Sequence, residues 1–192
     1  GVKNKNIKKI NGKPLVYHSY ETATKTKIFS KIFISSDSNI FLNICKKFGA
    51  EDLIKRPKFL SNDKSGKIEA IKHALIYAEK KYNTKYDYIV DLDATSPLRT
   101  VSDIKEAYKK FLKSNSSNLF SVTSSNRSPY FNMVEIKNSK VQLVKQANKQ
   151  YLRRQDTPVT YDLNASIYIW KREPLIKNKK LIQNKTSIYI MP

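Results

Sequence analysis

The spacing of apolar residues predicts that strands and helices alternate over the first two-thirds of the chain. Segments 32–36, 86–92 and 119–123 are short apolar runs bounded by polar residues, which is typical of buried strands. Apolar residues recur every three to four positions over about 40–48, 65–81 and 104–112, which is typical of amphipathic helices. Ser38 is placed to cap the first of these helices, and Thr100 with Asp103 predicts a capping box before the third.

This alternation predicts an α/β fold. Strands that alternate with helices form βαβ units, so we expect a Rossmann-like three-layer α/β/α architecture with a mostly parallel sheet. Ligands of such folds bind beyond the carboxyl ends of the strands. The residues that directly follow two of the strands, 36–37 and 93–99, are therefore the first candidates for a functional site.

The pattern changes after about residue 124. Segments 131–137 and 141–145 read as two strands joined by Asn138, Ser139 and Lys140, which predicts a hairpin. Later strands are expected at 167–170 and 187–191. We therefore expect one domain over 1–192 with an inserted lobe at 124–160, suited to dimer contact or to closing over a site.

The composition changes this picture little. The 192 residues suit one domain, and the net charge of +21 by itself would suggest a nucleic-acid or membrane partner. Only six of the 37 basic residues are arginine, and the lysines are spread along the chain, so we expect neither partner. The remaining positive field would attract an anionic substrate. The single cysteine, Cys45, and the lack of a long apolar run indicate a cytoplasmic protein.

The segment Asp91-Leu92-Asp93-Ala94-Thr95-Ser96-Pro97-Leu98-Arg99 is the richest in candidate chemistry. Asp91 and Asp93 share one face of the strand, because side chains two residues apart on a strand point the same way. Such a pair can hold Mg²⁺, which prefers carboxylate and phosphate oxygens. The same residues also suit an ordinary strand end with turn-forming side chains and Arg99 on the surface, and the residue types leave both interpretations open.

This segment resembles the acylneuraminate cytidylyltransferases, the CMP-sialic acid synthetase family, which carry Gln-Pro-Thr-Ser-Pro-Leu-Arg after a strand. The likeness extends over almost the whole chain, and the order and spacing of its motifs are more specific than any one of them. The other matching segments are 1–7, 11–15, 34–37, 55–57, 62–63, 128–132, 153–155 and 163–168.

The resemblance implies a fold, a reaction and roles for individual residues. The anomeric hydroxyl of a nonulosonic acid, a sialic-acid-like sugar, attacks the α-phosphorus of CTP, and pyrophosphate leaves. Mg²⁺ is implied as cofactor and a homodimer as the assembly. The expected catalytic residues are Lys5 at the triphosphate, Asp93 at the sugar, and Arg154, which would reach the neighbouring subunit's site. The expected substrate-binding residues are Asn6, Arg56, Lys67, Thr95, Ser96, Asn164 and Tyr168.

The sequence also departs from the family pattern. It starts within the nucleotide loop, so we expect a chain truncated at both ends, with a gap at the centre of the sheet, the metal-binding carboxylates beyond Pro192, and no activity as a fragment. Asp93 replaces glutamine, and Lys67 stands where a small polar residue is common, which favours a substrate such as legionaminic acid. The alternatives are a CMP-Kdo-type or other sugar nucleotidyltransferase, or a non-catalytic scaffold.

Overall fold

The computed structural model describes residue 2 and residues 4–62 and 66–192, and the chain divides into two compact units. Unit 1 comprises Gly1–Ser121 and Ala165–Tyr189, and unit 2 comprises Val122–Asn164 and Ile190–Pro192. The expected helix start at Ser65 and part of the expected matches at 1–7 and 62–63 lie outside the described residues.

Unit 1 holds the helices and most of the strands. The helices are α1 (Leu15–Thr26), α2 (Asn39–Lys47), α3 (Lys67–Tyr82), α4 (Val101–Lys113) and α5 (Arg172–Lys177). The strands of the chain are β1 (Lys9–Ile10), β2 (Lys13–Pro14), β3 (Phe33–Ser36), β4 (Asp52–Lys55), β5 (Tyr88–Leu92), β6 (Asn118–Ser124), β7 (Val134–Lys137), β8 (Lys140–Leu143), β9 (Tyr161–Lys171) and β10 (Thr186–Ile190). Short 3₁₀ turns cover Lys5–Ile7, Lys58–Leu60 and Arg154–Asp156.

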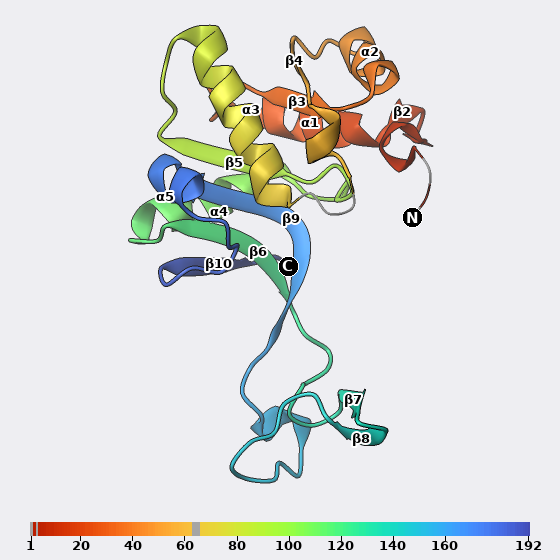
Figure 1. The fold of residues 1–192 in the computed structure, drawn as a ribbon, viewed down its shortest axis with the longest axis vertical. Helices are drawn as coiled ribbons and strands as arrows, with labels where there is room; N and C mark the ends of the chain where they lie inside the picture. The colour runs from red at the N-terminus through yellow and green to blue at the C-terminus, as the bar shows by residue number, and fades with distance from the viewer. Residues whose placement is uncertain (1, 3, 63–65) are drawn as a thin grey trace. The chain divides into compact units, whose positions relative to one another are not determined.

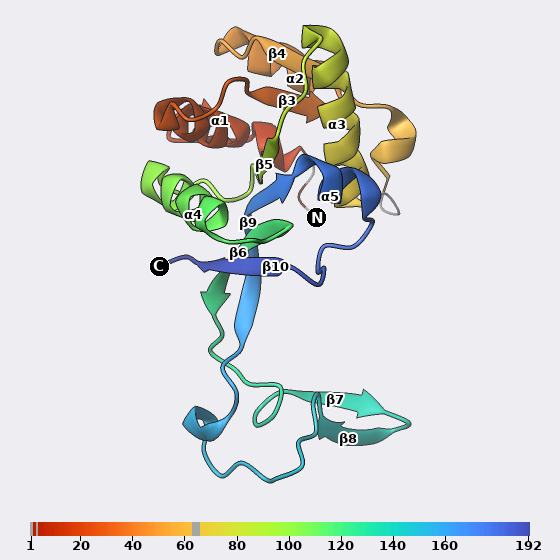
Figure 2. The ribbon, with the colours of Figure 1, turned by 90° about the vertical axis from the view of Figure 1, so that its left-hand side faces the viewer.

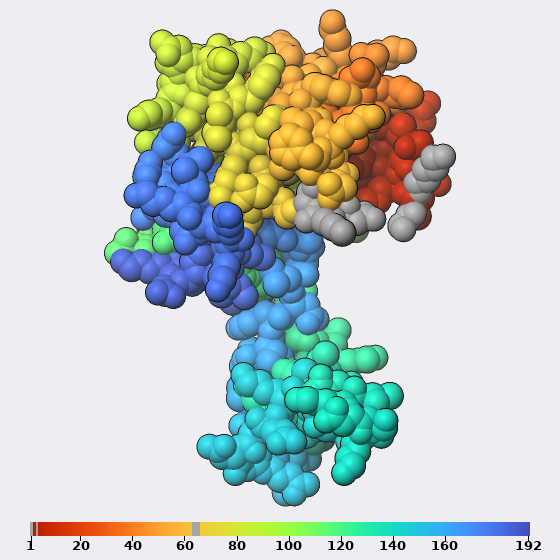
Figure 3. Space-filling model, in the orientation of Figure 1, coloured from red at the N-terminus to blue at the C-terminus, as the bar shows by residue number. Residues whose placement is uncertain are grey.

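The strands of unit 1 lie between helices (Figures 1 and 2). Strands β10, β6, β9 and β5 form a four-stranded sheet in that order, and β3 pairs with β4 in a separate two-stranded sheet. Helices α1 and α4 contact each other on one side of the strands, and α3 and α5 contact each other on the opposite side. The surface view shows α5, in blue, beside α3, in yellow (Figure 3). The three-layer α/β/α architecture is therefore confirmed.

Strand direction differs from the expectation of a mostly parallel sheet. Strands β3 and β4 are parallel, but β5 and β9 are antiparallel, with Asp91 opposite Tyr168. The sheet is mixed because β9 returns from a long excursion through unit 2 instead of following a crossover helix, and only a crossover produces parallel neighbours.

The hairpin of unit 2 is tighter than its spacing suggested. Lys140 pairs with Lys137, so the turn has two residues and β8 spans Lys140–Leu143 instead of 141–145. Asn138 and Ser139 both adopt positive φ, 51° and 59°. Two consecutive positive φ angles are the mark of a type I′ turn, whose twist matches that of the paired strands.

Burial identifies the centre of the large sheet. All residues from 118 to 122 on β6 and from 166 to 170 on β9 are buried, including Trp170 and Leu119. Strand β5, by contrast, has no fully buried residue. Cys45 is buried with Leu42 in a cluster where α2 packs on β3, as its place on the apolar face of the helix predicts. Strand β5 is thus an edge strand, and its free edge faces a cavity.

Candidate functional site

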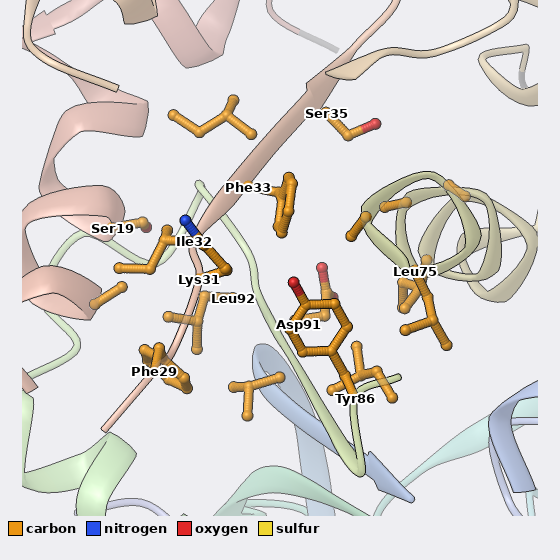
Figure 4. A pocket seen from close by; sticks show the side chains of 18 of the residues that line it. Ser19, Phe29, Lys31, Ile32, Phe33, Ser35, Leu75, Tyr86, Asp91 and Leu92 are labelled. Carbon is orange, nitrogen blue, oxygen red and sulfur yellow. The ribbon is translucent and has the colours of Figure 1, made fainter. Parts of the chain in front are cut away.

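A cavity of about 1040 Å³ lies between β3 and β5. Side chains from β3, β5 and α3 surround it, with Phe33, Leu75 and Leu92 among its apolar lining (Figure 4). Among the described residues, no ladder pairing joins β3 to β5, so the two strand edges that face this space are unpaired. The cavity lies where the sequence analysis expects a gap in the sheet centre.

Polar residues line one part of the same cavity. They include Asn6, Arg56, Lys67 and Asp93, four of the expected site residues, which come from widely separated parts of the chain. The backbone amide of Arg56 donates to Ser36 O at 2.8 Å, and this bond holds Arg56 beside the carboxyl end of β3. The structure therefore brings two cationic side chains, an amide and a carboxylate to a strand-end cavity, where polar ligands of such folds bind.

The side chain of Asn6 has an unsatisfied acceptor. Its Oδ1 is buried and has no hydrogen-bond partner in the described part of the chain. A buried carbonyl oxygen without a partner costs free energy, so such atoms usually await water or a ligand. Asn6 lines the cavity, and a donor group on a ligand there would satisfy it.

Lys67 lies between two carboxylates. Its Nζ is 2.8 Å from Asp91 Oδ2 and 3.5 Å from Asp93 Oδ2. The same ammonium stands 3.8 Å from the ring centroid of Tyr168, the residue opposite Asp91 on β9. Burial alone would lower the pKa of Lys67, but Asp91, Tyr168 and Asp93 outweigh burial and raise it. The lysine is therefore charged over the whole physiological pH range.

The carboxylate of Asp93 is held in one orientation. Its Oδ1 accepts hydrogen bonds from Thr95 N at 2.9 Å and from Thr95 Oγ1 at 2.6 Å. Ser96 N donates to the backbone oxygen of Asp93 at 3.4 Å and closes the turn. Burial alone would raise the pKa of Asp93, but the bonds from Thr95 and the charge of Lys67 outweigh burial and lower it. Thr95 and Ser96 thus shape the turn that presents Asp93.

The other expected site residues lie elsewhere in the fold. Tyr168 is buried beneath Lys67 and packs on Phe120, so its ring supports the cluster. Lys5 is exposed in the first 3₁₀ turn and does not line the cavity. Within unit 2, Arg154 Nη1 donates to Asn126 O at 2.6 Å and Asn164 Nδ2 contacts Met191 Sδ at 3.2 Å.

Sequence reasoning missed the burial of Arg99. Its side chain is enclosed, with the residue 4% exposed, and it contacts Ser19 of α1 and Ser166 of β9. The Thr-Ser-Pro-Leu-Arg motif drew attention to Arg99, but the motif does not indicate which residues Arg99 contacts. Ser19 and Ser166 have no local signal, because their contacts join residues 80 and 67 positions apart.

The described residues do not form a metal site. They contain no group of three histidine, cysteine or acidic side chains able to hold an ion. Asp91 and Asp93 face the ammonium of Lys67, which stands where a cation between the two carboxylates would be. Of the two interpretations of this pair, a resident Mg²⁺ site does not fit. No helix of the described chain is long and apolar enough to cross a membrane.

Comparisons with known proteins identify the family of the chain. The family described as Cytidylyltransferase matches residues 1–191. The "CMP-N,N'-diacetyllegionaminic acid synthase" of Campylobacter jejuni subsp. jejuni is 41% identical over 191 residues, covering 100% of this chain and 80% of that protein. The "Post-translational flagellin modification protein B" of Campylobacter coli is 39% identical, with the same coverage.

A solved structure of a CMP:2-keto-3-deoxy-manno-octonic acid synthetase, complexed with CTP, has the same fold. Its TM-score is 0.64 at 16% identity, and the match covers 95% of this chain and 73% of that one. At this level of identity the likeness shows the fold alone, while the family follows from the sequence matches.

Proposed function

The chain belongs to the cytidylyltransferase family, and from that premise we propose that it is the catalytic core of an enzyme that transfers CMP from CTP to a nonulosonic acid. The observation that carries the proposal is the cavity between β3 and β5, where Asn6, Arg56, Lys67 and Asp93 gather from separate segments. Arg56 supplies a positive charge for the anionic nucleotide, and Asn6, Lys67 and Asp93 supply polar contacts for a sugar rich in hydroxyl groups.

The nucleotide side of the site consists of Asn6 and Arg56, which line the cavity, and of Lys5, which precedes Asn6 in the exposed first 3₁₀ turn. Their roles are to neutralise the triphosphate and to bind the nucleoside. Asn6 Oδ1 is the buried acceptor that still needs a donor, which an amino or hydroxyl group of CTP would provide. Arg56 is held at the strand end by its bond to Ser36 O, and a guanidinium there can bind phosphate through two hydrogen bonds.

The sugar side consists of Asp93 with Thr95, Ser96, Lys67 and Tyr168. The lowered pKa of Asp93 keeps it ionised at neutral pH, so it accepts hydrogen bonds from the sugar and is a poor proton acceptor. The anomeric oxygen forms a bond to the α-phosphorus, while the bond from the α-phosphorus to the oxygen bridging to the β-phosphorus breaks and pyrophosphate leaves. The proton of the hydroxyl is released to solvent. The protein contributes mainly orientation and charge neutralisation.

Mg²⁺ belongs to this reaction as the companion of the CTP phosphates, because divalent cations are usually bound through substrate phosphates. The chain's described carboxylates do not offer it a cage. The functional steps assigned to the residues above therefore do not depend on a metal held by Asp91 or Asp93.

Nucleotide binding tests the proposal directly. Calorimetry of the full-length protein with CTP, ATP, GTP and UTP in the presence of Mg²⁺ should show selective CTP binding. Arg56→Met should weaken CTP binding about tenfold or more, because it removes a charged phosphate contact worth about 1.5–3 kcal/mol. Lys58→Met removes the same charge from an exposed position outside the cavity and should leave binding within twofold. Equal binding of all four nucleotides would contradict the proposal.

The natural sugar is a diamino nonulosonate such as legionaminic acid. Support comes from the relative named for N,N'-diacetyllegionaminic acid and from Asp93, whose carboxylate suits substrate groups that donate hydrogen bonds. The test compares kcat/KM of the full-length protein on N,N'-diacetyllegionaminic acid and on N-acetylneuraminic acid. A preference for the second sugar would overturn this assignment.

The active form is a homodimer that uses one face of the β7–β8 hairpin. Val134, Ile136, Val141 and Leu143 share this face through the pairs Val134–Leu143 and Ile136–Val141. Ile136 is 79% exposed and Val141 71% exposed, although residues of this kind are usually buried. A second copy would cover them, and Arg154 and Asn164 belong to the same unit and would then serve the partner's site.

Sedimentation of two charge variants tests the dimer. Ile136→Lys places a charge within the apolar face and should convert dimer to monomer. Gln142→Lys adds the same charge to the opposite face, next to its partner Glu135, and should leave the dimer intact. An unchanged dimer in Ile136→Lys, or a monomeric wild-type protein, would exclude this interface.

A further inference from the structure

Arg99 is a buried cation outside the set of residues assigned to substrate binding. It lies in the loop between β5 and α4, and its residue is 4% exposed. No carboxylate of the described chain is within ion-pair distance of its guanidinium, although Asp91, Asp93 and Asp103 lie near enough to act on its charge. Because replacing buried charges with apolar side chains is often neutral or stabilising, packing alone gives no reason for an arginine here.

The guanidinium joins three separate elements. Nη1 donates to Ser166 O at 2.7 Å, to Ser166 Oγ at 3.2 Å and to Asp93 O at 3.3 Å. Nη2 donates to Ser19 Oγ at 2.8 Å, and Ser19 Oγ in turn donates to Asp93 O at 3.1 Å. Helix α1, the end of β5 and the middle of β9 are therefore tied to one planar group with a rigid donor geometry.

These bonds determine where the backbone of Asp93 lies. Its carbonyl accepts from Arg99 and Ser19, and its amide donates to Ser166 O at 3.2 Å. The side chain is then oriented by the two bonds from Thr95 to Oδ1. The remaining polar atom of Asp93 is the carboxylate oxygen Oδ2, which lies 3.5 Å from Lys67 Nζ. Each other polar atom of Asp93 is thus held by a neighbour.

The backbone beside Ser166 supports the same interpretation. Ala165 adopts φ of 49° within β9, a conformation that costs a non-glycine residue free energy. Such conformations persist only where surrounding contacts hold them. The bonds from Arg99 to the carbonyl and hydroxyl of Ser166 hold the residue that follows Ala165, two positions before Tyr168, the partner of Asp91 on β9.

We propose that Arg99 is a positioning residue for CMP transfer, which fixes Asp93 against the sugar substrate by binding the backbone at the end of β5 and in the middle of β9 and the hydroxyl of Ser19. The inference rests on the proposed function, since Asp93 is its contact with the reaction. Arg99 itself does not contact the substrate and acts only through Asp93. Its loss should therefore affect the sugar-dependent parameters, while nucleotide binding at Asn6 and Arg56 is retained.

Steady-state kinetics of the full-length protein tests the proposal with Arg99→Lys, Arg99→Met and Ser19→Ala. For both Arg99 variants we expect kcat/KM for the sugar to fall about 100-fold, as for other misplacements of about 1 Å, with CTP affinity within about twofold. Ser19→Ala removes one of the bonds and should give a smaller loss. A further variant, Arg99→Ala, leaves space for a guanidinium ion, and added guanidinium should partly restore its activity, which a general loss of stability would not allow.

Arg172→Met is the matched control. Arg172 is a partly buried arginine whose side chain is bonded to Glu79 at 2.7 Å, and its hydrogen bonds do not involve Asp93. Its loss should therefore lower the melting temperature and leave the kinetics unchanged. Arg99 variants that melt earlier but keep the wild-type kcat and sugar KM would overturn the proposal. If those variants do not fold, Ser19→Ala decides, and wild-type kinetics in that variant would overturn it. A wild-type protein that binds no CTP would instead refute the proposed function and this inference together.

Discussion

Lys67 shows how one side chain can be placed against its local preference. It is the first residue of α3, where the helix dipole disfavours a positive charge. Two carboxylates, Asp91 and Asp93, compensate at 2.8 and 3.5 Å. Without the lysine, the two carboxylates would repel each other and would also repel an anionic substrate in the neighbouring cavity. The lysine thus stabilises the cluster at the end of β5 and does not stabilise the helix.

At this scale we predict that Lys67→Met destabilises the protein. The cluster is about one-third exposed, so the loss should be about 1 kcal/mol, below the 3–5 kcal/mol of a fully buried pair. Chemical denaturation measures it, with Lys80→Met, an exposed lysine of the same helix, as the control that should change stability by less than about 0.5 kcal/mol.

The pH dependence of that difference follows from the two pKa shifts. The pKa of Asp93 is lowered in the folded state, so its contribution is present above the unfolded value of about 3.9 and disappears as pH falls through the folded value. The pKa of Lys67 is raised, so its contribution is lost only as pH rises above about 10.4. The stability gap between wild type and Lys67→Met should therefore be constant near neutrality and shrink below about pH 4. A gap that grows in acid would contradict this.

At the scale of elements, helix starts carry much of the local information. Thr100 caps α4 in both directions: its Oγ1 accepts from Asp103 N at 3.1 Å, and Asp103 Oδ2 accepts from Thr100 N at 2.8 Å. Ser38 caps α2 with a single bond from Phe41 N at 3.2 Å. Both helices present buried stripes to the strands, so a frayed first turn would also loosen the packing beneath it.

We predict that Thr100→Ala costs more stability than Ser38→Ala. Loss of an N-cap costs about 0.5–2 kcal/mol, and the Thr100 variant also leaves the nearly buried carboxylate of Asp103 with fewer partners. Urea denaturation of both variants measures the difference. Thr100→Ser keeps the hydroxyl and should recover most of the lost stability. Equal losses in Thr100→Ala and Ser38→Ala would show that the reciprocal bonds add nothing.

At the scale of the whole molecule, charge is the dominant property. A net charge of +21 repels itself in the compact state and attracts anions. The ion pairs that the described residues form are mostly exposed and involve few of the 37 basic side chains, for example Lys25 with Glu21. Surface pairs of this kind contribute little, so much of the repulsion remains unbalanced.

Salt should therefore act in opposite directions on stability and on substrate binding. Raising ionic strength from about 0.01 M to 0.15 M shortens the Debye length from about 30 to 8 Å. We predict a higher melting temperature, by about 2–4 °C for each kcal/mol of repulsion relieved, and a higher KM for CTP. Thermal scans and initial rates in NaCl and in KCl measure both, and the two salts should agree. A melting temperature that falls with salt would contradict the repulsion argument.

The sequence by itself determined the local features of this protein. The cap at Ser38, the capping box at Thr100 and Asp103, and the strands at β3, β5 and β6 follow from patterns a few residues long, because backbone hydrogen bonding and periodicity are local. Those patterns also carried the family resemblance. They did not identify β4, where only Leu53 and Ile54 are apolar, or α5, whose six residues are too few for a helical period to build up.

Only the tertiary structure decided which distant residues meet. That Lys67 lies between Asp91 and Asp93, and that Arg99 is buried against Ser19 and Ser166, depends on strand order and on the antiparallel return of β9. Residue types at these positions were compatible with a metal site and an exposed arginine. The physical reason is that a charged side chain takes its role from the charges and polar atoms around it, and those come from segments that spacing along the chain does not connect.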